Sequence, residues 1–345
     1  MQESDLTRQP TTDPTLIYRY RDAIYAADLL ATALVFLDFF TWLHANPSDL
    51  RQICRHFEIQ PRPTDVMLTL FNAMGLTEQS NGRFQLTALG SEHLVRSSCW
   101  YLGPYYASLK DRPVCKDFLA VLRTGKPANW GSFKDEKSWA QAMEDSAFTD
   151  QFTAAMDCRG VYLGAAVAKA VDLNGRSSLL DIAGGSGIYA CAMVAAHPHL
   201  RATVFEKPPV DKVATNSITS RGHGERVHVI AGDMFKDPLP TGHDVHLFSN
   251  VLHDWDESEV LKLLATSYSA LPRGGMLIVH DAHINADKTG PLHVAEYSSL
   301  LMHATEGKCY SLTEMQHYLS KTGFVETRYR PTAASRSIIT ALKPG

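Results

Sequence analysis

The chain has 345 residues and a formal net charge of −4 at pH 7, with 45% hydrophobic and 20% charged residues. These values are typical of a globular protein of one large or two ordinary domains, and they argue against a basic nucleic-acid or membrane-surface binder. The six cysteines are scattered without C-x-x-C spacing, which argues against a zinc or disulfide framework and predicts a reducing, cytoplasmic location. The polar N-terminus and the lack of an apolar run of about 18 residues predict no signal peptide and no membrane span.

The first part of the chain is expected to consist of helices followed by a hairpin. Residues 1–14 are polar and expected to be frayed. Apolar residues at helical spacing run from Leu16 to Leu43 and are more numerous than a solvated helix needs, so we expect core or subunit contacts there. Two shorter helices are predicted over residues 50–57 and from Pro63, and the Asn81-Gly82 pair indicates a β-hairpin.

This order of helices and hairpin predicts a winged helix. The expected recognition helix over residues 63–73 contains Asp65 and no Lys or Arg, although DNA contacts depend on such cations. We therefore interpret residues 1–100 as a dimerisation domain that also helps to cover a substrate, and we keep a DNA-binding regulator as an alternative. Residues 101–172 are expected to form a helical linker or lid, whose many aromatic side chains are mostly core, with one or two in a substrate pocket.

The stretch Ser178–Gly187 carries the first chemical signal. An apolar strand ends in Asp181 and is followed by a turn containing Gly184, Gly185 and Gly187, and a helix follows. This order is typical of a nucleotide-binding βαβ unit, because glycines allow close backbone approach to a ligand. The next strand ends in Glu206, which can bind ribose hydroxyls. The pattern predicts an adenosyl ligand and leaves open a dinucleotide or S-adenosylmethionine; a turn without a ligand is the plainer alternative.

Strands and helices alternate over residues 173–345, which predicts a doubly wound α/β domain. Five strands are expected to be parallel, and the last two, within residues 324–342, lack a helix between them and should pair antiparallel. Polar residues follow three strands, at Gly232–Phe235, Ser249–Trp255 and His280–His283. Because such sheets bind ligands at the carboxyl ends of their strands, His253 and Asp281 should meet as a base and an orienting carboxylate.

With these motifs in order, the chain resembles the S-adenosylmethionine-dependent small-molecule methyltransferases of the caffeate/acetylserotonin O-methyltransferase type. The resemblance rests on Asp181–Gly187, Gly232–Phe235, Leu252–Trp255 and Glu306–Lys308. It implies a seven-stranded Rossmann-like catalytic domain, a homodimer formed through the N-terminal domain, and His253 as general base. It also implies cofactor contacts from Asp181, Gly184, Gly185, Gly187, Glu206, Gly232, Asp233, Met234, Phe235 and Ser249, and substrate contacts from Phe152, Met156 and His303.

The chain departs from the plant pattern at four places, one of which is Asp281 in place of the first Glu that flanks the catalytic His. Ala183 replaces the first motif glycine, and Ser249 stands where plant members carry Lys. Cys309 stands where they carry a second acid beside the base, so one flanking carboxylate is expected to be absent.

Methyl transfer to an aromatic hydroxyl is the leading prediction, because a phenol must lose a proton and His is suited to accept it. The alternative is C-methylation of an enolisable α-keto acid, assisted by a metal held by His253 and His303; otherwise no metal is expected. An NAD-dependent dehydrogenase is a further alternative, opposed by the His253–Trp255 motif after the fourth strand.

Overall fold

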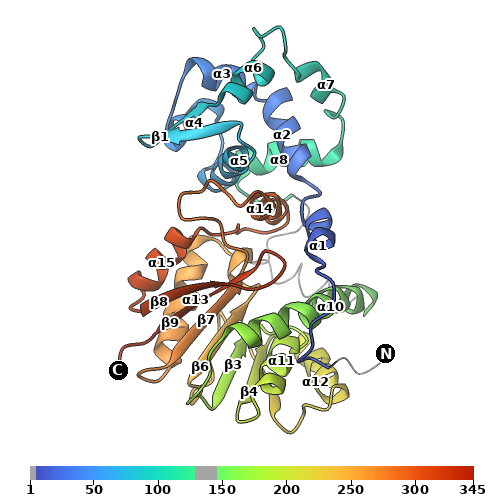
Figure 1. Cartoon of the computed structure of the whole chain (residues 1–345), viewed down its shortest axis with the longest axis vertical. Coiled ribbons are helices and arrows are strands. Elements are labelled where there is room, and N and C mark those ends of the chain that lie inside the picture. The colour runs from blue at the N-terminus through green and yellow to red at the C-terminus, as the bar shows by residue number, and fades with distance from the viewer. Residues whose placement is uncertain (1–4, 129–145) are drawn as a thin grey trace. The chain divides into compact units, whose positions relative to one another are not determined.

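A computed structural model describes residues 5–128 and 146–345. The chain forms two compact units (Figure 1). The first holds the described residues of the stretches 1–16, 139–282 and 314–345, and the second holds those of 17–138 and 283–313. Residues 283–313 therefore belong with N-terminal helices, although they follow the fifth parallel strand in the sequence. The predicted boundaries at residues 100 and 172 separate the expected dimerisation domain, lid and catalytic domain by their function, and they stay a prediction.

The first unit is built on a seven-stranded sheet in the order β5-β4-β3-β6-β7-β9-β8. The five strands β3 to β7 pair in parallel, and β9 pairs antiparallel with both β7 and β8, as predicted. The strands span Ser178–Ile182 (β3), Arg201–Glu206 (β4), Val227–Ala231 (β5), Val245–Ser249 (β6), Met276–Asp281 (β7), Val325–Pro331 (β8) and Ser337–Leu342 (β9). The strand order reverses between β3 and β6, and ligands bind in sheets of this kind at that switch point.

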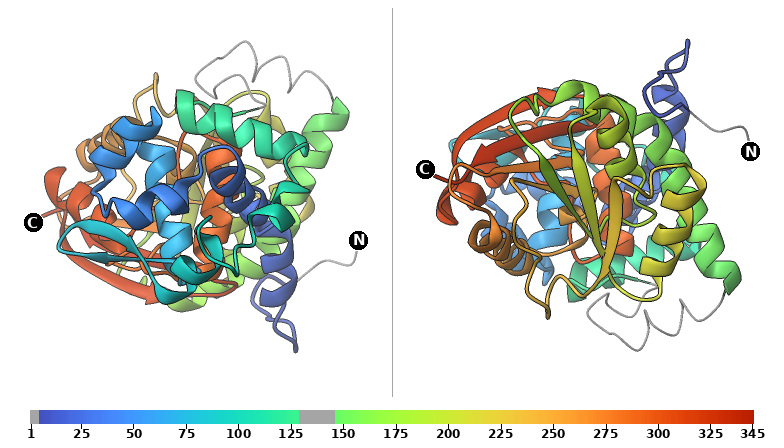
Figure 2. Two further views of the ribbon diagram at one scale, coloured as in Figure 1. Left: turned by 90° about the horizontal axis from the view of Figure 1, so that it is seen from above. Right: turned by 90° about the horizontal axis from the view of Figure 1, so that it is seen from below.

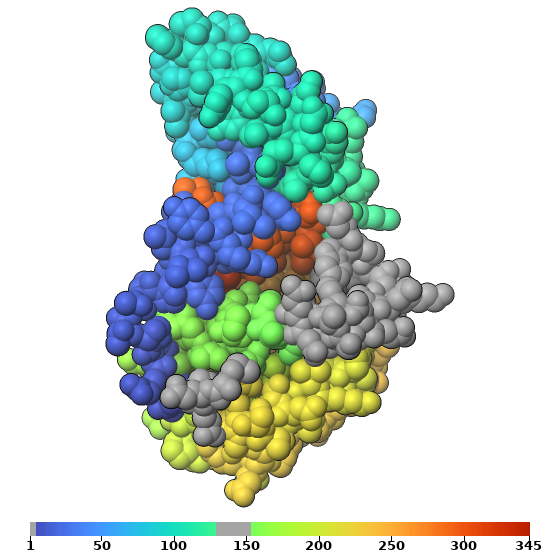
Figure 3. Space-filling view, turned by 90° about the vertical axis from the view of Figure 1, so that its right-hand side faces the viewer, coloured from blue at the N-terminus to red at the C-terminus, as the bar shows by residue number. Residues whose placement is uncertain are grey.

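Helices cover both faces of this sheet (Figures 1 and 2). The helices of this unit are α10 (Ser146–Ala170), α11 (Ile188–Ala196), α12 (Val210–Ser220), α13 (Glu257–Ala270) and α15 (Leu312–Lys321), and a short 3-10 helix, η1 (Leu252–Asp254), follows β6. Helices α10 and α11 pack closely because Gly160 leaves room: a Cβ there would lie 2.2 Å from Cγ2 of Ile188. The N-terminal residues 5–16 run along α10 (Figure 3), where the Gln9 side chain donates to the carbonyl of Tyr162.

The second unit is mainly helical. It contains α2 (Ala26–Val35), α3 (Phe39–Ala45), α4 (Leu50–Phe57), α5 (Pro61–Ala73), α6 (Ala88–Leu94), α7 (Gly103–Ala107), α8 (Pro113–Thr124) and α14 (Leu292–Ala304), and the residues of α1 (Thr15–Asp22) from Ile17 onward. The predicted hairpin is present as β1 (Thr77–Ser80) and β2 (Arg83–Leu86). Three phenylalanine rings form the centre of its core, with centroids 5.0–5.8 Å apart: Phe39, Phe40 and Phe71.

The structure divides the apolar stretch 16–43 into three helices. The break before α3 lies at Asp38, whose φ of 48° is left-handed and cannot continue a helix. Helix α5 also begins earlier than expected, at Pro61, which occupies its first turn without needing a backbone donor. Within residues 5–128 and 146–345, no single helix is long and apolar enough to cross a membrane, and only the bent pair Thr15–Val35 and Phe39–Ala45 together reaches that composition.

Helix α5 is buried along most of its length and packs against α14. Its Asp65 accepts ion pairs from two lysines of the segment 283–313: Lys288 Nζ lies 2.7 Å from Oδ1 and Lys308 Nζ lies 2.5 Å from Oδ2. The acid in this helix therefore joins two distant parts of the sequence within one unit.

Candidate active site

The glycine turn lies at the carboxyl end of β3 and leads into α11. Gly185 and Gly187 have left-handed φ angles of 59° and 76°, and Ala183 adopts 55° at the place of the family's first glycine. A Cβ on Gly185 would meet nothing within 4 Å, whereas one on Gly187 would lie 2.8 Å from Cδ1 of Ile218. Gly187 is thus required by packing, while the space in front of Gly185 is open for a ligand.

Glu206 braces this turn from the end of β4. Its Oε2 accepts a hydrogen bond of 2.8 Å from the Gly185 N–H, and its Oε1 accepts one of 2.8 Å from the Lys207 N–H. Burial raises the pKa of Glu206 to about 7. A carboxylate held by backbone donors at this strand end is suited to bind a ribose diol.

Asp181 is the buried acid of the same turn. Its side chain is fully buried, and neither carboxylate oxygen makes a hydrogen bond of standard geometry within the part of the chain that the structure describes, although the backbone N–H of Ala190 lies close enough to lower its pKa. Burial, and to a smaller degree the charge of Glu206, raise its pKa to about 7. An unsatisfied buried carboxyl costs free energy until a donor reaches it, directly or through water. The turn therefore fits a ligand that brings hydrogen-bond donors or positive charge.

Helix α10 is anchored to the turn by Asp157. Ser186 Oγ donates a 2.6 Å hydrogen bond to Asp157 Oδ1, and Arg221 pairs with Asp157 Oδ2. Asp157 could not be selected from the sequence, because it lies in the middle of a helix and its role depends on the packing of α10 against α11. Met156 lies one residue earlier and is half-buried, and its sulfur accepts a hydrogen bond of 3.4 Å from Arg159 Nη2.

The loop after β5 contains the residues predicted to bind adenine. A Cβ on Gly232 would lie 2.2 Å from the Phe205 ring, so packing alone explains that glycine. Asp233 Oδ1 accepts from the Phe235 N–H at 2.9 Å, and Lys207 Nζ lies 3.3 Å from Asp233 Oδ2. Met234 is half-buried, and Phe235 is 38% exposed.

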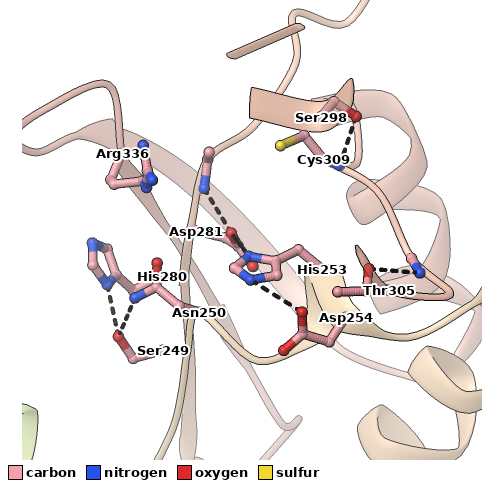
Figure 4. Close-up of polar contacts among 12 residues, drawn as sticks. Ser249, Asn250, His253, Asp254, His280, Asp281, Ser298, Thr305, Cys309 and Arg336 are labelled. Atoms are coloured by element: carbon pink, nitrogen blue, oxygen red, sulfur yellow. Dashed lines mark hydrogen bonds and ion pairs between the residues drawn. The ribbon is translucent and has the colours of Figure 1, made fainter. Parts of the chain in front are cut away.

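The structure brings His253 and Asp281 into contact (Figure 4). His253 lies in η1, directly after β6, and its Nδ1 is 2.5 Å from Oδ1 of Asp281 at the end of β7. Both side chains are buried, and Asp281 Oδ1 also accepts the Ala282 N–H at 2.8 Å. The carboxylate fixes the ring so that Nδ1 carries the proton and Nε2 is the nitrogen that can accept another.

Asp254 supplies a second carboxylate beside the same ring, and the sequence pattern does not predict this contact. Its Oδ1 lies 3.5 Å from His253 Nε2 (Figure 4). Burial lowers the pKa of His253, but the charges of Asp281 and Asp254 raise it by more, so the pKa lies above its ordinary value. Arg159 of α10 acts in the opposite direction and lowers the pKa of His253 slightly. Burial raises the pKa of Asp254.

Two other predicted site residues have partners of their own. The Ser249 hydroxyl is buried and lies 2.8 Å from His280 Nδ1. His303 belongs to the second unit, where its Nε2 lies 3.3 Å from Asp117 Oδ2 and its ring lies 4.7 Å from that of Tyr25. The side chain of Phe152 lies outside the described residues. Among residues 5–128 and 146–345, no group of three or more His, Cys, Asp and Glu side chains is arranged to hold a metal ion.

Comparison with known proteins agrees with this geometry. The family model of the O-methyltransferase domain matches residues 118–325. The chain is 31% identical to 3-hydroxy-5-methyl-1-naphthoate 3-O-methyltransferase of Streptomyces sahachiroi, covering 91% of this chain and 90% of that protein. It is 29% identical to L-tyrosine C(3)-methyltransferase of Streptomyces lavendulae, covering 84% and 81%. A solved O-methyltransferase family 2 protein from Planctomyces limnophilus, in complex with apigenin, superposes with a TM-score of 0.88 at 31% identity and 98% coverage of both chains.

The sheet, the glycine turn and these matches together define an α/β methyltransferase. The chain belongs to the O-methyltransferase family. It is an enzyme that transfers a methyl group from S-adenosyl-L-methionine to a small molecule. The dehydrogenase interpretation of the glycine turn is therefore wrong.

Proposed function

We propose that the enzyme methylates a hydroxyl group of an aromatic metabolite, with His253 as the general base. The observation that carries this proposal is the buried His253–Asp281 pair, whose 2.5 Å contact leaves Nε2 as the proton-accepting atom. The naphthoate methyltransferase and the apigenin complex among the relatives support an aromatic acceptor.

The cofactor fits the residues around the glycine turn. Glu206 would bind the ribose hydroxyls, the open space at Gly185 would receive the methionine portion, and Asp181 would gain donors for its two unsatisfied oxygens. We also assign contacts to Gly184 and Gly187 in the turn, to Ser249, and around the adenine to Gly232, Asp233, Met234 and Phe235. When bound, S-adenosylmethionine supplies an electrophilic methyl group on a positively charged sulfur.

The side chains of this protein then have to ionise and orient the acceptor. Nε2 of His253 accepts the proton of the acceptor hydroxyl, and Nδ1 donates to Asp281 throughout. Asp281 stabilises the imidazolium that forms, and Asp254, at 3.5 Å from Nε2, adds to that effect. We assign acceptor contacts to Met156, Phe152 and His303, which would align the hydroxyl oxygen with the methyl group.

C-methylation of a phenol ring is a second candidate, favoured by the similarity to the L-tyrosine C(3)-methyltransferase. Removing the phenol proton also activates the adjacent ring carbon, so His253 could serve either outcome. The metal-assisted alternative requires His303 as a ligand, and the Nε2 atom of His303 lies 3.3 Å from Asp117 instead.

We further propose that residues 1–100 form a winged-helix-like domain that dimerises and does not bind DNA, followed by a helical lid over 101–172 and the catalytic domain over 173–345. Burial of α5 against α14 leaves the face of α5 unavailable to a DNA groove.

The proposed dimer contact is the exposed apolar face of α1. Leu16, Ile17 and Tyr20 of this helix are 62%, 75% and 76% exposed, and a second copy would cover them. Tyr20→Asp should convert a dimer to a monomer in sedimentation at micromolar concentration; a wild-type monomer would contradict the dimer.

The six cysteines are all free, and this supports a reducing, cytoplasmic location.

The proposed cofactor site is tested at Gly185. Gly185→Val places a branched side chain in the open ligand space and should abolish binding of S-adenosylhomocysteine in calorimetry. Gly242→Val is the matched control, because Gly242 also has a positive φ, of 87°, and also faces open space. Equal affinity for S-adenosylhomocysteine in both variants would contradict the assignment of this turn.

The acceptor is identified by incubating the enzyme with a methyl-labelled cofactor and a panel of candidate acceptors that includes apigenin and hydroxynaphthoates, and by measuring which of them becomes labelled.

A further inference from the structure

A cluster of polar side chains joins the cofactor-binding helix to the strand ends that precede the base. Asn250 Nδ2 donates to Tyr189 Oη at 3.0 Å and to Ser249 Oγ at 3.2 Å, and Ser249 Oγ lies 2.8 Å from His280 Nδ1. Figure 4 shows Ser249, Asn250 and His280 beside the His253–Asp281 pair. Tyr189 is the second residue of α11, two positions after Gly187, and its ring lies 5.5 Å from that of His280.

The backbone at Asn250 is where β6 turns toward the base. Its φ of 55° is left-handed, and its N–H donates to the His280 carbonyl at 2.8 Å. Three residues later the chain reaches His253. A left-handed residue other than glycine is held by its surroundings, so the contacts of Asn250 help to set the direction in which the chain leaves β6.

The side-chain amide of Asn250 is hydrogen-bonded through its nitrogen alone within the described residues. Its nitrogen makes both hydrogen bonds of the side chain, while its Oδ1 is buried and has no hydrogen-bond partner within the described residues. Burial raises the pKa of Tyr189, so its hydroxyl stays protonated over any practical assay range. Among the described residues, the Tyr189 hydroxyl therefore provides the hydrogen bond that ties the Asn250 side chain to an element other than β6.

We propose that Tyr189 and Asn250 form a positioning brace through which the cofactor-binding helix fixes the loop that carries His253. Neither residue needs to touch the reacting atoms. Ligand binding at the glycine turn orders the start of α11, Tyr189 moves with that helix, and its hydrogen bond to Asn250 orders residues 249–255. The enzyme thereby aligns its base when the methyl donor is in place. This inference rests on the proposed role of His253 and on cofactor binding at the glycine turn.

The test is hydrogen–deuterium exchange with and without S-adenosylhomocysteine. In the wild type, the ligand should protect the peptide over residues 184–190 and the peptide over 249–255. In Tyr189→Phe, affinity should stay within about threefold and the first peptide should still be protected, but protection of the second should be lost. Loss of one neutral hydrogen bond should lower kcat by about 3- to 10-fold with little change in either KM.

Matched variants separate the hydrogen bond from the backbone. Asn250→Gly keeps the left-handed turn and removes the amide, and Asn250→Ala adds strain as well. Asn250→Gly should lower kcat at least as much as Tyr189→Phe, because it also removes the hydrogen bond to Ser249. Adding Tyr189→Phe to Asn250→Gly should cause no further loss. Tyr318→Phe, which removes a hydroxyl that donates to Glu257 at 3.3 Å, should leave exchange at 249–255 unchanged.

Several outcomes would overturn the brace. One is ligand protection of residues 249–255 that persists in Tyr189→Phe. Another is additive loss of kcat in the double variant, since residues that act through one bond cannot add. If the wild type fails to bind S-adenosylhomocysteine, cofactor binding at the turn is refuted instead, and if it binds but His253→Ala retains full activity, the assigned base is refuted.

Discussion

Replacing Asp281 with Asn tests how the base is held. The change removes the negative charge 2.5 Å from Nδ1 of His253 while keeping the shape of a buried side chain. A hydrogen bond to a charged group contributes about 1.5–3 kcal/mol, and each 1.4 kcal/mol is about tenfold in rate. Because the imidazolium forms only as the acceptor loses its proton, the loss falls on the transition state. We expect kcat to fall by about 10- to 100-fold, less than for His253→Ala.

The pH profile of the same variant gives the sign of the effect. The nearby carboxylates raise the pKa of His253, so in the wild type the neutral base is lost as pH falls through a value above the ordinary histidine range. In Asp281→Asn the pKa must drop, and the acidic limb of the kcat profile should move to lower pH. The assay is steady-state methyl transfer from labelled cofactor between pH 5 and 9, with S-adenosylhomocysteine affinity as the control. A kcat within threefold of the wild type and an unmoved acidic limb would refute the orienting role of Asp281.

Two further predictions concern stability. Gly160→Val forces side-chain atoms into Ile188, since a Cβ at residue 160 would lie 2.2 Å from Cγ2 of Ile188. This variant should lower the free energy of unfolding, measured in urea, by about 1–3 kcal/mol. Gly224→Val is the control and should change the free energy of unfolding little, because the nearest atom to a Cβ at residue 224 would be 3.9 Å away. Burial lowers the pKa of His246 to about 3. As pH falls below the ordinary value of 6.5, only the unfolded chain therefore takes up a proton at this histidine. The free energy of unfolding of the wild type should then fall, relative to that of His246→Asn, by up to about 1.4 kcal/mol per pH unit. A pH-independent difference between these two proteins would contradict the second prediction.

The sequence predicts the catalytic sheet because its signals are local. Glycines and acids at strand ends mark the turn at Asp181–Gly187, and the parallel alternation of strands brings the ends of β6 and β7 to one edge. The meeting of His253 with Asp281 follows from that topology alone. The antiparallel pair at the C-terminus is likewise predicted by the missing helix between two short strands.

The remaining features depend on distances that a pattern does not contain. Asp254 follows His253 directly, and only the geometry of η1 turns its carboxylate back to within 3.5 Å of Nε2. Asp157 lies in mid-helix, and it reaches Ser186 because α10 packs on α11. The grouping of residues 283–313 with the N-terminal helices is decided by the burial of α5 against α14 and by the Asp65 ion pairs, which are long-range contacts.

The central claim, that His253 removes the acceptor proton, is tested most directly by varying the acidity of the acceptor. The single-turnover rate of His253→Ala is compared with that of the wild type at one pH, using ring-substituted forms of an acceptor found in the panel. For phenols with a pKa of about 10, the variant should be slower by about 10²- to 10⁴-fold. For nitro-substituted phenols that are already ionised at the assay pH, the difference should nearly vanish, because no proton remains to be removed. A defect of constant size across the series, or no defect with the least acidic phenol, would contradict the account.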